Sequence, residues 1–243
     1  MEGKVAVVTG GSRGIGRGIC LSLAREGAAV IVNYFQNKTA ADDVVKNIKS
    51  YDRKAMSIQA DVRRFEEVEH MVEVTLEHFE KIDILVNNAG LVKPLSFLKA
   101  TREDWHHIID THLNGTYNCC KLVLPSMVER KTGRVINISS GIAVTGFHGY
   151  ASYCAAKAGI ISLSKTLAKE LASKGIYVNV VAPGFVPTEL QDSISPEVRA
   201  RLLDSIPMKR FGKVEEIAEV VTFLASSGSY INGQVIHVDG GFI

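Results

Sequence analysis

Short apolar runs alternate along the chain with longer segments in which apolar residues recur every three or four positions. The runs are typical of strands buried on both faces, and the longer segments are typical of amphipathic helices. Strands are predicted at Val5–Thr9, Ala29–Asn33, Ala55–Ala60, Ile82–Asn87, Arg134–Ile138, Tyr177–Ala182 and Val235–Val238. Helices are predicted at about Ile15–Arg25, Thr39–Ser50, Glu66–Phe79, Arg102–Arg130, Ser152–Ser173 and Val214–Leu224. This alternation predicts an α/β fold with a doubly wound parallel sheet of seven strands and helices on both faces.

Length and composition favour one domain over residues 1–243. No Pro/Ser-rich linker divides the 243 residues, and 46% of them are hydrophobic. A net charge of +2 gives no reason to expect nucleic acid or a membrane surface as a partner. The four cysteines form no C-x-x-C pair and no metal-ligand spacing. We therefore expect a cytoplasmic protein with reduced thiols, no bound metal and no membrane span.

A glycine-rich turn, T-G-G-S-R-G-I-G, follows the first predicted strand from Thr9 to Gly16. Gly10, Gly14 and Gly16 let the backbone approach a ligand, and the free N–H groups of the next helix face an anion. The spacing departs from the commoner G-x-G-x-x-G fingerprint, and no G-K-[ST] follows as in a nucleotide-hydrolysing loop. Its place after the first strand predicts a Rossmann-type dinucleotide site.

The charges near the expected adenosine ribose favour NADP(H) over NAD(H). An NAD site usually ends its second strand with a carboxylate that accepts from the ribose 2′-hydroxyl. Here that strand ends in Asn33, and the next carboxylate is Asp42. Arg13, inside the glycine turn, offers a cation for a 2′-phosphate. Each residue taken alone has an ordinary explanation as well. Arg13 could be a solvent-exposed loop arginine, and Asn33 could be an asparagine that ends a strand in a turn.

Two more polar turns fall at the carboxyl ends of predicted strands, where ligands bind in open α/β sheets. Asp61-Val62 follows the third strand, and its carboxylate can accept from an adenine amino group. Asn87-Asn88-Ala89-Gly90 follows the fourth and is small enough for a cofactor to lie against its backbone. Turn chemistry alone would also explain either motif.

Ser140, Tyr153 and Lys157 are the candidate catalytic residues. Ser140 follows the apolar run at Arg134–Ile138, and Tyr153 and Lys157 share one face of a predicted helix at i,i+4 spacing. A phenol has a reference pKa of about 10, and a neighbouring cation is expected to lower it into the range of proton exchange. The alternative is a core tyrosine beside a lysine that extends to solvent.

Taken in order, these motifs resemble the short-chain dehydrogenase/reductase family over essentially the whole chain. P-G-F-V-P-T (Pro183–Thr188) and the terminal H-V-D-G-G (His237–Gly241) complete the match. The resemblance implies that Tyr153 is the proton donor, that Lys157 holds the nicotinamide ribose and depresses the tyrosine pKa, and that Ser140 donates to the substrate carbonyl. Cofactor contacts are implied at Gly10, Ser12, Arg13, Gly14, Ile15, Gly16, Asn33, Asp61, Val62, Asn88, Ala89, Gly90, Tyr153, Lys157, Val186 and Thr188.

One position departs from the family pattern. The family usually carries an asparagine in the crossover helix after the fourth strand, as part of a water-linked proton relay to the lysine. His112 stands at that position, in D-T-H-L-N-G-T-Y. If His112 joins the relay, its charge state should matter between about pH 5 and 8, where histidine usually titrates. The alternative is that His112 only fills space.

Within the family, A-K-E-L-A-S-K-G-I-Y-V-N-V-V-A-P-G-F looks most like the 3-oxoacyl-acyl-carrier-protein reductases. That likeness implies a ketone substrate on an acidic carrier protein, carrier contacts at Lys131 and Lys174, and a homotetramer. We expect the substrate to lie under a lid at Glu189–Gly212. The alternatives are reduction of another ketone, such as a polyketide, sugar or cyclic substrate, and a non-catalytic dinucleotide-binding scaffold.

Overall fold

The fold is built on one parallel sheet. The computed structural model describes residues 1–187, 196–227 and 229–243. Seven strands within that part of the chain pair in the order β3-β2-β1-β4-β5-β6-β7. They are β1 (Val5–Val8), β2 (Ala29–Tyr34), β3 (Ala55–Gln59), β4 (Ile84–Asn87), β5 (Gly133–Ile138), β6 (Ile176–Pro183) and β7 (Val235–Val238). The predicted α/β class and doubly wound sheet are confirmed.

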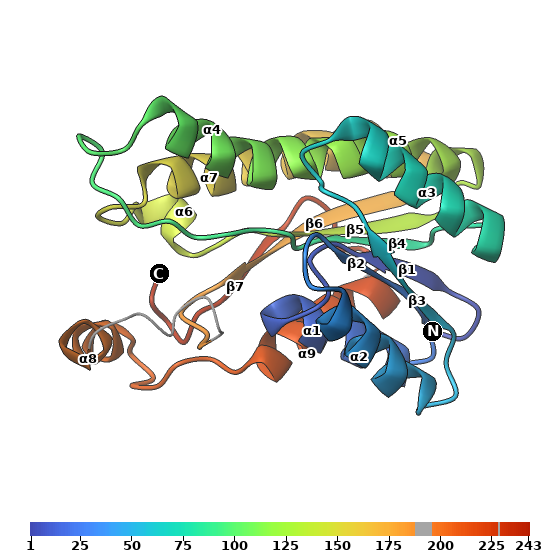
Figure 1. Ribbon diagram of the computed structural model, residues 1–243, viewed down its shortest axis with the longest axis horizontal. Coiled ribbons are helices and arrows are strands. Elements are labelled where there is room, and N and C mark those ends of the chain that lie inside the picture. Colours follow the sequence, from blue (N-terminus) through green and yellow to red (C-terminus); the bar gives the residue numbers. More distant parts are fainter. Residues whose placement is uncertain (188–195, 228) are drawn as a thin grey trace.

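Helices cover both faces of the sheet (Figure 1). The α-helices are α1 (Gly14–Arg25), α2 (Lys38–Lys49), α3 (Phe65–Phe79), α4 (Arg102–Ile109), α5 (Gly115–Glu129), α6 (Ile142–Thr145), α7 (Ala151–Leu171), α8 (Pro196–Ser205) and α9 (Val214–Ser226). Alternate residues of β1 divide the core between the two layers. Ala6 and Val8 pack toward α1, α2 and α9, whereas Val5 and Val7 pack toward α3, α5 and α7. A central strand buried on both faces therefore reads as a continuous apolar run.

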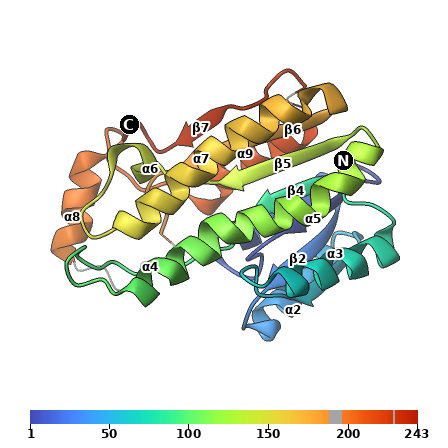
Figure 2. The ribbon, with the colours of Figure 1, turned by 90° about the horizontal axis from the view of Figure 1, so that it is seen from above.

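The carboxyl ends of the strands meet at one edge of the sheet, where the strand order changes direction. β1 pairs in parallel with β2 on one side and with β4 on the other, at the point where the two halves of the sheet diverge. In open α/β sheets this switch point is where ligands bind. Seen from above in Figure 2, α5 and α7 run side by side, with α5 packed on β4 and β5 and α7 packed on β6. α7 contributes the predicted Tyr153 and Lys157 from this layer.

The single helix predicted over Arg102–Arg130 is interrupted. A π-helical turn, η1 (Asp110–Asn114), separates α4 from α5 and carries His112. A π-turn inserts one residue without breaking the apolar pattern on either side, so periodicity does not reveal it. α8 lies inside the segment predicted as a lid, which was not expected to be helical. The part of that segment at 189–195 lies outside the described residues.

No helix within the described parts of the chain is long and apolar enough to cross a membrane.

Candidate functional site

A cleft of about 910 Å³ opens at the carboxyl edge of the sheet. Its size falls in the range of small-molecule and cofactor sites. Residues from the ends of β1 to β6 and from α7 line it, and nearly every residue predicted for the site is among them. These are Gly10, Ser12, Arg13, Gly14, Ile15, Gly16, Asn33, Asp61, Val62, Asn88, Ala89, Gly90, His112, Ser140, Tyr153, Lys157 and Val186. Thr188 lies outside the described residues.

The glycine turn packs too closely for side chains at two of its positions. Gly10 has a φ of +62°, and a Cβ there would lie 2.9 Å from the Cα of Ala89. A Cβ at Gly16 would lie 2.2 Å from the carbonyl oxygen of Gly10. Helix α1 can therefore begin directly under the turn, with its first N–H groups directed at the cleft. The turn forms a cradle suited to a phosphate group.

Thr9 joins this turn to the polar turn after β4. Its hydroxyl accepts from the backbone N–H groups of Asn88 (2.9 Å) and Ala89 (3.0 Å). The Asn88 side chain donates in return to the carbonyl oxygens of Thr9 (2.9 Å) and Gly10 (3.2 Å). Because both turns are tied at the switch point, the floor of the cleft is preorganised by the protein's own hydrogen bonds.

The side chain of Asn33 is buried, and it forms hydrogen bonds with the backbone of two neighbouring segments. Its amide nitrogen donates to the carbonyl oxygen of Ala60 at 3.0 Å, and its oxygen accepts from the N–H of Gly10 at 3.2 Å. Asn33 thus links the end of β2 to the glycine turn and to the end of β3. No carboxylate occupies this position, in agreement with the sequence expectation.

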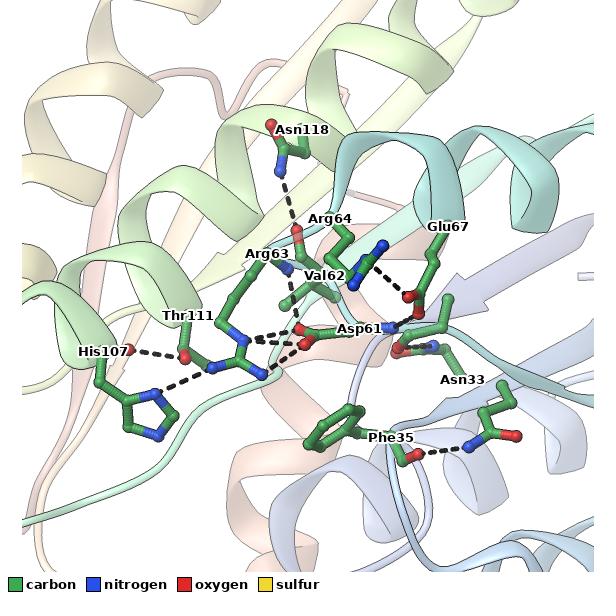
Figure 3. Close-up of polar contacts among 12 residues, drawn as sticks. Asn33, Phe35, Asp61, Val62, Arg63, Arg64, Glu67, His107, Thr111 and Asn118 are labelled. Carbon is green, nitrogen blue, oxygen red and sulfur yellow. Dashed lines mark hydrogen bonds and ion pairs between the residues drawn. The ribbon is translucent and has the colours of Figure 1, made fainter.

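Asp61 lies at the end of β3 and is held by Arg63, a residue the sequence analysis did not single out. The Arg63 Nε lies 2.9 Å from each carboxylate oxygen of Asp61, as Figure 3 shows. Burial alone raises the pKa of Asp61, but the hydrogen bonds and charge of Arg63 outweigh it, and the pKa falls below its usual value. Asp61 is therefore ionised at neutral pH.

Ser140, Tyr153 and Lys157 converge at the other end of the cleft. The Ser140 side chain lies close enough to that of Tyr153 to lower its pKa. The Nζ of Lys157 lies 5.7 Å from the centroid of the Tyr153 ring and donates to the carbonyl oxygen of Ile138 at 2.6 Å. Strand β5 positions the serine, and one helical turn of α7 positions the tyrosine and the lysine.

Burial dominates the protonation of this group. It raises the pKa of Tyr153 to about 12, although the nearby Ser140 side chain acts to lower it. It also lowers the pKa of Lys157 to about 7. Lys157 is not among the groups that act on the Tyr153 pKa in this structure, and burial is the largest influence on both residues. Tyr153 remains a neutral phenol, which is the form that can give a proton.

His112 is buried beside Tyr153, with the two ring centroids 5.1 Å apart in an edge-to-face arrangement. Its Nε2 lies 2.8 Å from the carbonyl oxygen of Leu91 and 3.2 Å from the Leu91 nitrogen. A Cβ at Gly90 would lie 2.4 Å from the ring, so glycine is required there. Burial, assisted by the charge of Lys157, lowers the pKa of His112 to about 3. The titration between pH 5 and 8 that a relay role would bring is therefore not expected of this buried ring, and the space-filling alternative fits it better.

Lys131 and Lys174, the predicted carrier contacts, lie away from the cleft. Both are exposed, and each lies two residues before a strand, Lys131 before β5 and Lys174 before β6. Their loops touch, since a Cβ at Gly175 would lie 2.2 Å from the carbonyl oxygen of Lys131. They therefore occupy the amino edge of the sheet, opposite the edge that carries the catalytic residues.

The sequence analysis missed several residues of the adenosine end of the cleft. These are Tyr34, Phe35, Gln36, Asn37, Lys38, Thr39, Arg63, His107 and Thr111. The segment from Tyr34 to Thr39 follows β2 at the carboxyl edge, and that position alone could have identified it. No local pattern points to His107 and Thr111, because the crossover from β4 brings them to the cleft.

Comparison with known proteins defines the class. The family model described as enoyl-(acyl carrier protein) reductase matches residues 10–243. A crystal structure from Sinorhizobium meliloti 1021, described as a short-chain alcohol dehydrogenase, superposes with a TM-score of 0.96 at 32% identity, covering 100% of this chain and 97% of that one. The fold and the site define an oxidoreductase, and the chain belongs to the short-chain dehydrogenase/reductase family.

The relatives with an assigned name are similar to this chain over nearly their whole length, and their names specify a reaction. The chain is 45% identical to the 3-oxoacyl-(acyl-carrier-protein) reductase FabG of Staphylococcus epidermidis, over 98% of each chain. It is 44% identical to the reductase of the same name from Synechocystis, over 100% of this chain and 98% of that one. The FabG of Thermotoga maritima is 39% identical over 100% of this chain and 99% of its own length.

Proposed function

We propose that this protein is an NADPH-dependent reductase that converts the keto group of a 3-oxoacyl thioester, borne by an acyl-carrier protein, to a secondary alcohol. The observation that carries the proposal is the convergence of Ser140, Tyr153 and Lys157 at the end of a dinucleotide-sized cleft, with the Lys157 Nζ 5.7 Å from the centroid of the Tyr153 ring. The names of the relatives at 39–45% identity support the substrate.

The charge of the cleft supports NADPH, which carries several negative charges. Among the described residues that line it, four are lysines or arginines and one is acidic. The basic residues are Arg13, Lys38, Arg63 and Lys157, and the acidic residue is Asp61. Gly10 and Gly16 leave room for the pyrophosphate, and Asn33 stands where an NAD site usually has a carboxylate. These residues fit the cofactor that the family implies.

The reduced nicotinamide supplies the hydride when it is bound. The Ser140 hydroxyl donates to the substrate carbonyl oxygen and stabilises negative charge as it develops there. Tyr153, kept as a neutral phenol by its raised pKa, gives its proton to the same oxygen. Lys157 lies beside the ring and is anchored by Ile138.

An aromatic row extends from Tyr153 and supports a substrate with an apolar chain. Each ring meets the next edge to face, with centroids 5.2–6.1 Å apart. The row runs through Tyr153, Tyr150, Phe147, Phe185 and Phe242. Aromatic faces of this kind bury hydrocarbon efficiently.

The carrier protein would bind a basic edge that is distant from the same chain's cleft. Lys131 precedes β5, a strand of six residues that spans about 20 Å at roughly 3.3 Å per residue, and Lys174 precedes the neighbouring strand β6. We infer that a carrier held there delivers its acyl group to the cleft of another copy in a tetramer. This inference fits the exposed charge of the two lysines, which an acidic carrier would neutralise.

Purified protein tests the proposal directly. We expect NADPH oxidation with a 3-oxoacyl thioester on the carrier protein, and little with the matching enoyl thioester or with free cyclic ketones. Tyr153→Phe should lower kcat by about 10²–10⁴-fold, the usual contribution of a positioned acid. Tyr150→Phe is the matched control, since it keeps the ring of the aromatic row, and it should retain most activity. Preference for the enoyl thioester, or for another ketone, would contradict the proposed substrate.

A further inference from the structure

The adenosine end of the cleft already contains a tightly held arginine. Asp61 accepts four contacts from Arg63, and these are the backbone N–H at 3.0 Å, Nε at 2.9 Å to each oxygen, and Nη2. A carboxylate offers about four acceptor positions. The side chain of Asp61 is 8% exposed, so water has little access to the oxygens. Arg63 therefore takes up the acceptor capacity of the one carboxylate lining the described part of the cleft.

The guanidinium of Arg63 also contacts two other residues that line the cleft, Phe35 and His107. Its Cζ lies 5.4 Å from the centroid of the Phe35 ring, and its Nη1 lies 2.9 Å from Nδ1 of His107. Figure 3 shows Arg63 between His107 on α4 and Asp61 at the end of β3, close to Phe35. All four residues line the cleft. The arginine thus crosses the cleft in the space between Phe35 and Asp61.

That space is too small for a purine while Arg63 occupies it. An aromatic base stacked between two groups needs about 7 Å, since each contact takes at least about 3.5 Å. The guanidinium carbon and the Phe35 ring are 5.4 Å apart. The amino group of an adenine would likewise find the Asp61 oxygens engaged. The base can use Phe35 and Asp61 after the side chain of Arg63 has moved.

We propose that Arg63 is a displaceable internal occupant of the adenine position, and that cofactor binding exchanges the arginine on Asp61 for the adenine amino group. This inference rests on the proposed NADPH function of the same cleft. The exchange makes Arg63 a determinant of cofactor affinity, because its ion pair with Asp61 must be loosened during binding. It also links recognition of the adenine amino group to release of the guanidinium.

Arg64 provides a matched control for the test. It is the next residue, its side chain is 67% exposed, and it forms an ion pair with Glu67 at 2.9 Å. Arg63→Met and Arg64→Met each remove one positive charge at neighbouring positions, so their effects on the long-range attraction of NADPH nearly cancel. Dissociation constants are measured by calorimetry, without turnover. Two ligands are used: NADPH, and an analogue carrying hypoxanthine, in which a carbonyl replaces the 6-amino group of adenine.

We expect Arg63→Met to bind NADPH about three- to tenfold more tightly than Arg64→Met, which is the range that loosening a partly exposed ion pair would cost. The hypoxanthine analogue should show no such gain, because its carbonyl cannot donate to Asp61. Weaker or equal binding of NADPH by Arg63→Met would overturn the exchange. An equal gain for both ligands would also overturn it, since the amino group would then play no part.

Removal of Arg63 leaves Asp61 without its partner, so thermal unfolding of each variant is recorded first. If Arg63→Met does not fold, Arg63→Lys carries the test, with Arg64→Lys as its control. Lysine keeps the positive charge but cannot make the two parallel hydrogen bonds of a guanidinium to a carboxylate. Arg63→Lys should therefore bind NADPH more tightly than Arg64→Lys does. Weaker binding by Arg63→Lys would overturn the proposal. Absence of NADPH binding by the wild-type protein would instead refute the proposed function.

Discussion

At the scale of single residues, His112 links the site to the stability of the fold. The ring is 2% exposed, and its Nδ1 has no hydrogen-bond partner among the described groups. Its pKa falls from 6.5 to about 3, so the folded state binds this proton less readily than the unfolded state. The resulting stability is fully present above about pH 6.5 and is lost progressively as the pH falls toward 3.

Replacement of His112 by asparagine should therefore flatten the acid limb of the stability curve. Between pH 6.5 and 4.5, the wild-type protein should lose about 1.4 kcal/mol per pH unit more than His112→Asn, as measured by urea unfolding. The groups that act on His112 electrostatically are Lys157 and His107, and both remain in the variant. His106→Asn removes an exposed imidazole from α4 and should keep the wild-type slope. The pH–rate profile provides a second check. If the wild-type profile shows an ionisation near neutral pH and the His112→Asn profile lacks it, the His112 ring does not stay neutral as expected.

Sequence reasoning at this scale succeeded where a residue's role depends on its position after a strand. Ser140 and Asp61 were placed correctly in the cleft because the carboxyl ends of parallel strands share one edge. It failed where protonation depends on contacts between distant segments. The raised pKa of Tyr153 and the lowered pKa of His112 both come from burial that packing creates. Nothing in the local sequence records how much of either ring is covered.

At the scale of elements, helix α1 is held against the glycine turn by the lack of a side chain at Gly16. Gly18, one half-turn later, packs instead against α9, where a Cβ would lie 2.2 Å from a methyl carbon of Val214. The two glycines thus serve different contacts of the same helix. One sets the distance between α1 and the cleft, and the other sets the distance between α1 and α9.

Gly16→Ala should impair cofactor binding more than it impairs folding. The added methyl group would meet the Gly10 carbonyl, which is backbone, so the turn or the helix has to shift. We expect the dissociation constant for NADPH, measured by its fluorescence, to rise at least about tenfold, since positioned helix N–H groups favour phosphate strongly. Gly18→Ala is the control, and it should lower the melting temperature while leaving that constant within about twofold. Equal loss of affinity in both variants would show that α1 responds as one rigid unit.

The π-turn between α4 and α5 shows the limit of periodicity at this scale. The sequence predicted one helix over Arg102–Arg130, and apolar spacing continues through Asp110–Asn114. A π-turn changes the hydrogen-bonding pattern but keeps the chain helical, so it leaves no breaker in the sequence. Its effect is to carry His112 into contact with Leu91 and Tyr153. Only the path of the loop after β4 reveals that contact.

At the scale of the whole molecule, α5 and α7 form one broad surface on the same face of the sheet (Figure 2). Tyr117 on α5 is 49% exposed, and Trp105 on α4 is 37% exposed. Tyr230 and Ile243, near the carboxyl terminus, are also exposed. Apolar rings on an otherwise well-buried helix layer are typical of surfaces that bind another subunit. Contacts between subunits are also required if a carrier protein bound to one copy is to deliver its acyl group to the cleft of another, as proposed above.

We therefore predict a homotetramer, with four chains of 26.4 kDa, by light scattering at micromolar concentration. Closed oligomers repeat the same contact by symmetry, so one charge placed in an interface acts at every copy of it. Tyr117→Glu on α5 should reduce the measured mass to a dimer, because a carboxylate placed in an apolar interface has to lose its hydration in every copy of that contact. Phe65→Glu at the start of α3 introduces the same charge at another exposed ring and should leave the tetramer intact. A monodisperse wild-type monomer would refute the assembly, and with it the delivery of acyl groups from one copy to another.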